Sequence, residues 1–145
     1  MNISGINPGQ LKLSGPVLAK IYMGRINTWN DPEILGINDG LRLPDTKITV
    51  VRRADGSGTT WNFTNYLSKV SEDWSRQYGC SKEIAWFEGT VGGQKNAGVA
   101  AMVKKIKGAI GYVESAYAFE SRMTYAQMMN KSGKFVQPDN DSFQA

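Results

Sequence analysis

Apolar residues recur with a helical period in two segments near the start of the chain. Ser14 and Pro16 supply an N-cap and an early-turn proline ahead of the first segment, which predicts a helix over residues 15–23. Asp31 and Pro32 repeat these start signals before a shorter apolar cluster. We therefore expect two consecutive helices, the second of them short.

Further along the chain, apolar runs of strand length alternate with helical patterns. The runs cover residues 48–52, 83–87 and 109–113, and the first is rich in β-branched residues, which suits a strand buried on both faces. Between the runs, one helical pattern covers residues 59–78, straight or kinked, and Gly92–Gly93 opens another that ends in lysines. This order predicts an α/β fold in which helices cover a sheet.

The last part of the chain predicts a short helix and a hairpin. Ser115 is a suitable N-cap for a helix that ends near Glu120. Residues 124–129 and 135–136 flank a turn at Ser132–Gly133. The chain has no internal repeat, low-complexity tract or interdomain linker, so we expect a single domain.

Composition and charge narrow the choice of partners. The 145 residues include 17 Lys and Arg against 13 Asp and Glu, which gives a formal net charge of +4 and a pI of about 9.2. Excess positive charge favours anionic partners, but the basic residues are scattered, so small anions fit the pattern better than a nucleic-acid backbone. The four tryptophans are expected in the core, because no basic stripe accompanies them.

Several absences limit the chemistry. The sequence contains no histidine, which removes the commonest general base and the commonest metal ligand, so we expect neither a metal nor another cofactor. Cys80 is the single cysteine, so an intrachain disulfide is impossible. No apolar stretch reaches the roughly 18–20 residues of a membrane helix, and the first residues lack the basic and apolar regions of a signal peptide.

The segment Arg53-Ala54-Asp55-Gly56-Ser57-Gly58-Thr59 combines the groups that bind oxyanions. An arginine ends the predicted strand, glycines permit a tight turn, and hydroxyl residues open the next helix. Amides at a helix N-terminus carry partial positive charge, hydroxyls donate, and a guanidinium binds two oxygens at once. The plainer alternative is that Ser57 or Thr59 only caps the helix. A nucleotide-binding loop is disfavoured, because the segment lacks a Gly-Lys-Ser/Thr ending.

Two neighbouring features have both a structural and a chemical interpretation. Asp55 follows Arg53 by two residues, and we expect it to orient the guanidinium rather than to act as a general base. The glycine-rich residues 89–96 could cradle a second anion, but such a loop more often lets a strand and a helix pack closely. We therefore interpret this second segment as scaffold.

Residues 50–59 resemble the signature of the periplasmic phosphate-binding proteins of bacterial phosphate ABC transporters. The resemblance continues through residues 18–26, Trp29 and residues 108–114, and so covers nearly the whole chain. In that family, two α/β lobes close on a dehydrated phosphate. The resemblance implies that residues 1–145 form one α/β lobe, the second, of a type II periplasmic-binding-protein-like fold, with a central mixed sheet flanked by helices.

The resemblance also implies a role for each residue of the segment. It implies that Arg53 pairs with phosphate oxygens, that Ser57, Gly58 and Thr59 donate hydrogen bonds to them, and that Asp55 orients Arg53. The implied function is capture of inorganic phosphate for import, without catalysis. The full-length parent would be periplasmic and would work with the membrane permease of the transporter. The family's first-lobe carboxylate, which accepts the phosphate proton, has no counterpart here, so half a site is expected.

Two other functions fit parts of the pattern. An enzyme acting on phosphate esters would need a histidine, a metal cluster or an activated nucleophile, and the sequence offers none of these. The second alternative is a self-associating scaffold or interaction module without significant phosphate affinity, which would form a homodimer through exposed strand edges. Light scattering on the purified chain separates a dimer from a monomeric binder.

Overall fold

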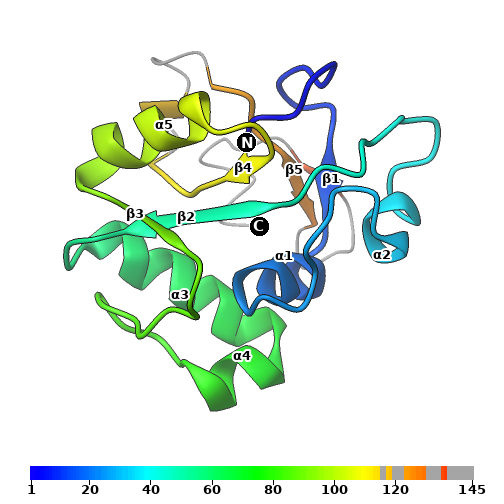
Figure 1. Ribbon diagram of the computed structural model, residues 1–145. Coiled ribbons are helices and arrows are strands. Elements are labelled where there is room, and N and C mark those ends of the chain that lie inside the picture. The colour runs from blue at the N-terminus through cyan, green and yellow to red at the C-terminus, as the bar shows by residue number, and fades with distance from the viewer. Residues whose placement is uncertain (115–116, 119–122, 130–134, 137–145) are drawn as a thin grey trace.

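The computed structural model describes residues 1–114, 117–118, 123–129 and 135–136. Over these residues the chain folds into short strands and helices of the predicted α/β class (Figure 1). None of the described helices has the length and apolar character needed to cross a membrane. The described elements are, in chain order, β1 (Lys12–Leu13), α1 (Gly15–Tyr22), α2 (Pro32–Leu35), β2 (Thr49–Arg53), α3 (Gly58–Val70), α4 (Glu72–Gln77), β3 (Val91–Gly93), α5 (Lys95–Lys105), β4 (Ala109–Ile110), β5 (Gln127–Met129) and β6 (Phe135–Val136).

A parallel sheet of β3, β2 and β4, with β2 in the centre, forms the middle of the fold. Helix α5 covers one face of this sheet, whereas α1 and α3 lie on the other (Figure 1). Val51 of β2 packs on the α5 side with Val99 and Val103, and Val50 packs on the opposite side with Ile21 of α1. The prediction that this strand is buried on both faces is therefore confirmed.

A second sheet contains β1, β5 and β6. Strand β1 pairs parallel with β5, and β5 pairs antiparallel with β6, so this second sheet is mixed, whereas the strands of the central sheet pair only in parallel. The predicted hairpin is present as β5 and β6, whereas its turn at Ser132–Gly133 lies outside the described residues. Most of the helix predicted from Ser115 to Glu120 also lies outside them. Strand β1 has no counterpart in the sequence prediction, because two residues show no periodicity.

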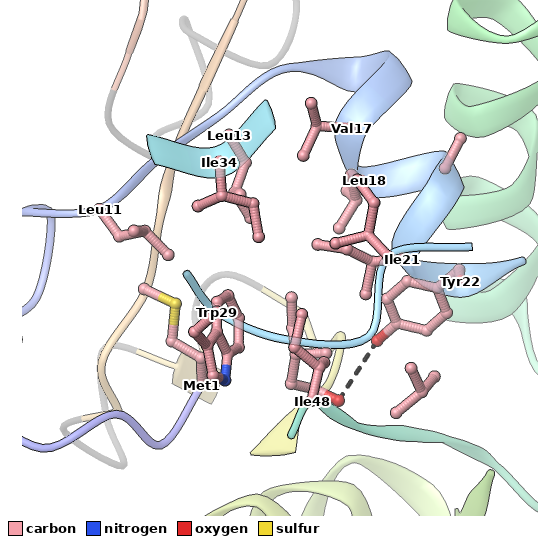
Figure 2. Close-up of a cluster of buried hydrophobic side chains, with 14 of the residues drawn as sticks. Met1, Leu11, Leu13, Val17, Leu18, Ile21, Tyr22, Trp29, Ile34 and Ile48 are labelled. Carbon is pink, nitrogen blue, oxygen red and sulfur yellow. Dashed lines mark hydrogen bonds between the residues drawn. The ribbon is translucent and has the colours of Figure 1, made fainter. Parts of the chain in front are cut away.

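The larger hydrophobic core joins α1 and α3 to β1 and the N-terminal segment (Figure 2). Trp29 is fully buried there, and its Nε1–H donates to the carbonyl of Gly108 at 2.9 Å. Trp74 is also fully buried, and Trp86 packs half-buried against the same core, as expected. Trp61 is 43% exposed on the first turn of α3, so the prediction that it belongs to the core is wrong.

Several predicted elements differ from the observed ones. Residues 83–87 do not form a strand. Trp86 and Phe87 pack against the larger core, so this apolar run marks buried side chains in a segment without a sheet partner in the described structure. The helical pattern of residues 59–78 forms two helices, α3 and α4. They separate at Ser71, whose hydroxyl accepts the N–H of Trp74 at 3.2 Å and caps α4.

The strand beside β2 is β3, which includes the two glycines that were expected to begin a helix. Val91 lies opposite Val51, and Gly93 lies opposite Arg53 in the parallel register. A Cβ on Gly93 would lie 2.6 Å from the amide nitrogen of Val99 in α5, so only glycine allows β3 and α5 to pack this closely. At Gly93, the glycine-rich segment of residues 89–96 therefore allows a strand and a helix to pack closely, which is the structural role that the sequence analysis favoured.

Candidate anion-binding site

Arg53 is the last residue of β2, and only 9% of its surface is exposed. Its Nε donates to Oδ1 of Asp55 at 2.8 Å and its Nη2 donates to Oδ2 at 2.7 Å, which makes a bidentate ion pair. A guanidinium has five N–H donors, of which this pair uses two and leaves three. The side chain is therefore fixed in one orientation and keeps donors for another acceptor.

Asp55 connects Arg53 to the start of α5. Its Oδ1 also accepts the backbone N–H of Lys95, the first residue of α5, at 3.2 Å. The hydrogen bond from Arg53 is the main reason why the pKa of the Asp55 carboxyl lies well below its ordinary value, and the same bond raises the pKa of the guanidinium. Both groups are charged at neutral pH, so Asp55 is poorly suited to act as a general base.

Helix α3 begins at Gly58, three residues after Asp55. Ser57 is its N-cap: the hydroxyl accepts the N–H of Thr60 at 3.0 Å, and the carbonyl accepts the N–H of Trp61 at 3.1 Å. The backbone amides of Gly58 and Thr59 have no acceptor among the described residues, as the first-turn geometry requires. Free amides and the helix dipole together make this N-terminus suitable for a negatively charged ligand.

A buried hydroxyl pair joins Arg53 to Ser57, and the sequence did not indicate it as part of the site. Thr60 Oγ1 lies 2.7 Å from Tyr112 Oη and 3.0 Å from Ser57 Oγ. Tyr112 Oη also accepts the backbone N–H of Arg53 at 3.1 Å. Burial raises the pKa of the Tyr112 hydroxyl, so it stays protonated at neutral pH. Two features of the sequence could have indicated this pair. Thr60 directly follows the predicted segment, and Tyr112 lies in residues 108–114, which share the family resemblance.

A cleft of about 240 Å³ opens beside Arg53 and Asp55. Arg52 and Lys82 add two cationic side chains to its lining, and Glu83 adds one further carboxylate. Cations therefore outnumber carboxylates around the cleft by three to two. This balance favours an anionic occupant.

The structure brings the predicted residues together in two adjoining groups. Arg53 and Asp55 line the cleft, whereas Ser57, Gly58 and Thr59 at the start of α3 are not among the residues that line it. The hydroxyl contacts described above connect the two groups. The ligand roles assigned to these five residues stay predictions.

Comparison with known proteins identifies close relatives. The model of the PBP superfamily domain matches residues 2–144. The phosphate-binding protein PstS of Xylella fastidiosa is 52% identical over 145 residues, and that of Pasteurella multocida is 54% identical over 145 residues. Both matches cover 100% of this chain, but only 40% and 42% of the respective relatives. The chain thus spans less than half the length of the curated relatives it matches.

A solved structure supports the same fold. The structure of a high affinity periplasmic phosphate-binding protein bound with phosphate matches with a TM-score of 0.67, covering 94% of this chain and 38% of the other. The two sequences are 23% identical, so this likeness concerns the architecture alone. The expected architecture, one part of a periplasmic-binding-protein-like fold with helices flanking parallel strands, is confirmed.

Proposed function

The chain belongs to the PBP superfamily, and from this membership we propose that it binds inorganic phosphate at Arg53 and the N-terminus of α3. One observation carries the proposal: a nearly buried arginine with free donors lies beside a helix N-terminus, in a chain whose relatives are named phosphate-binding proteins. Arg53 donates to the phosphate oxygens, Ser57, Gly58 and Thr59 add hydrogen bonds, and Asp55 orients the arginine.

The contacts of Ser57 and Asp55 favour binding of phosphate over a catalysed reaction. The hydroxyl of Ser57 contacts the N–H and the hydroxyl of Thr60, and neither group can take up its proton as a base. Asp55 is held by Arg53 and has a strongly lowered pKa. An enzymatic reaction would lack an activated nucleophile here, and a phosphatase assay with and without added divalent metal tests this part of the proposal.

For the whole protein we propose a role in import. The chain covers about two fifths of the relatives named phosphate-binding protein PstS, so the site described here would be one half of a complete site. The parent protein would be periplasmic and would deliver phosphate to the membrane permease of an ABC transporter. The relatives give no support to the alternative of a self-associating module without phosphate affinity.

Calorimetric titration of the purified chain with inorganic phosphate tests the proposal. We expect a weak dissociation constant, about 1 mM, because the cleft is open to water and half of the ligands would come from elsewhere. We also expect the affinity to fall as salt is added, because exposed charges are screened. Absence of saturable binding at low salt would refute phosphate binding by this chain, and a micromolar constant would show that it carries a complete site.

Selectivity gives a second prediction. The proposed ligands are hydrogen-bond donors, and donors alone hardly distinguish hydrogen phosphate from sulfate. Parallel titrations at neutral pH and matched ionic strength should therefore give constants that differ by less than about a hundredfold, or 2.7 kcal/mol. A larger preference for phosphate would contradict this prediction. If such a preference is found and the Glu83→Gln variant loses it, Glu83, which lines the cleft, is the carboxylate that accepts the phosphate proton.

A further inference from the structure

The segment of residues 81–83 is attached to the first two turns of α3. Ser57, the N-cap of the helix, donates its backbone N–H to the carbonyl of Lys82 at 3.1 Å. One turn further on, the hydroxyl of the fully buried Thr64 accepts the backbone N–H of Ser81 at 3.1 Å. These hydrogen bonds fix the backbone of Lys82 beside the start of α3.

The side chain of Lys82 is exposed and lines the same cleft as Arg53 and Asp55. Among the described residues, neither an ion pair nor a hydrogen bond engages its ammonium group. The neighbouring carboxylate of Glu83 packs against the turn instead, because a Cβ on Gly56 would lie 3.0 Å from its Oε1. The positive charge of Lys82 is therefore available to a ligand in the cleft.

The two arginines of the cleft are more strongly engaged than Lys82. Arg53 and Asp55 form an ion pair, so together they bring no net charge to the cleft. Arg52 donates from Nε to Oγ1 of Thr90 at 3.2 Å and from Nη1 to the carbonyl of Arg53 at 3.4 Å, which uses part of its guanidinium. An ammonium has three donors, and Lys82 keeps all of them for an incoming anion.

We infer that Lys82 is a further ligand of the anion, an inference that rests on the proposed phosphate site. Arg53 and the amides at the start of α3 fix where the oxygens lie, because their donors have set directions. Lys82 adds a mobile point charge on a flexible stem, which contacts an oxygen on the solvent side and offsets the charge of the anion. The sequence analysis did not identify Lys82, because α3 and α4 separate it from the predicted segment.

The test compares Lys82→Gln and Lys82→Arg with the parent chain, with phosphate dissociation constants measured by NMR titration at an ionic strength of about 0.1 M. Lys82→Gln removes the positive charge and keeps a polar side chain. It should raise the dissociation constant by about threefold to tenfold, the range expected for a partly exposed charge contact. Lys82→Arg keeps the charge, so its dissociation constant should stay within about twofold of the parent value.

Lys69→Gln is the matched control. Lys69 is exposed in the last turn of α3, about 16 Å along the helix from its start, so the same loss of charge is screened there and binding should not change.

The outcomes separate the inference from the proposed function. Equal dissociation constants for Lys82→Gln and Lys69→Gln would overturn the inference and leave the proposed function intact. A loss in Lys82→Arg as large as that in Lys82→Gln would also overturn it, because the effect would then not follow the charge. No binding by the parent would instead refute the proposed function, and the inference with it.

Discussion

Arg53→Lys is expected to raise the phosphate dissociation constant by about ten- to a hundredfold, the equivalent of one lost charge-assisted hydrogen bond of about 1.5–3 kcal/mol. Arg53 engages Asp55 with two donors and retains others for the ligand. A lysine carries the same charge, but its compact ammonium cannot form the planar fork toward Asp55 and donate to phosphate at the same time. Titration of both proteins at fixed ionic strength measures the difference.

Arg25→Lys is the matched control for this substitution. Arg25 also pairs with a carboxylate: its Nη1 lies 2.9 Å from Oδ2 of Asp73. The Arg25 side chain, however, is 47% exposed. The control makes the same chemical change at an exposed ion pair, so phosphate affinity should stay at the parent value. Equal affinities in the parent and in Arg53→Lys would remove Arg53 from the ligand set.

Trp29→Ala should lower the free energy of unfolding by about 3–5 kcal/mol, because a fully buried indole is replaced by a cavity. The substitution also removes the hydrogen bond from Nε1 to the carbonyl of Gly108. That carbonyl still accepts the N–H of Thr49 at 3.2 Å, so it is not left without a partner, and the cavity dominates the cost. Since small domains have a total stability of about 5–15 kcal/mol, such a loss brings the chain close to unfolding.

Trp61→Ala provides the comparison for this stability prediction. The same side chain is deleted, but at a position that is 43% exposed, where a change of about 1 kcal/mol or less is expected. Urea denaturation followed by circular dichroism measures both variants without relying on tryptophan fluorescence. Similar losses for the two substitutions would contradict the assignment of Trp29 to the core and of Trp61 to the surface.

Elements with a clear local signal in the sequence, such as helix α1 and strand β2, were predicted correctly. Helix α1 was predicted from the N-cap before it and the proline in its first turn. Strand β2 was predicted from its run of β-branched residues. Residues 83–87 show the limit of that reasoning. An apolar run shows that side chains are buried, but it does not show whether the backbone finds a partner strand. That partner position is occupied by β3, whose glycines carry no strand signal.

The same limit applies to the candidate site. Arg53, Asp55 and residues 57–59 were predicted because they are contiguous, so that strand end, turn and helix cap appear in one short segment. Tyr112 contacts Thr60 across a separation of 52 residues, and such a contact is created by the fold. No local propensity or spacing indicates this contact, so the hydroxyl pair of Thr60 and Tyr112 became visible only in the structure.

The central strand β2 contributes to both hydrophobic cores, as does its neighbour β4. Val50 belongs to one core and Val51 to the other, so any fluctuation that lifts β2 away from its neighbours disrupts both cores at once. The free energy of local opening at β2 should therefore approach that of global unfolding, which places its amides among the slowest in the molecule to exchange with solvent. Arg53 ends this strand, so the guanidinium is attached to backbone that is expected to open rarely. A ligand that binds there consequently loses little free energy to ordering the main chain.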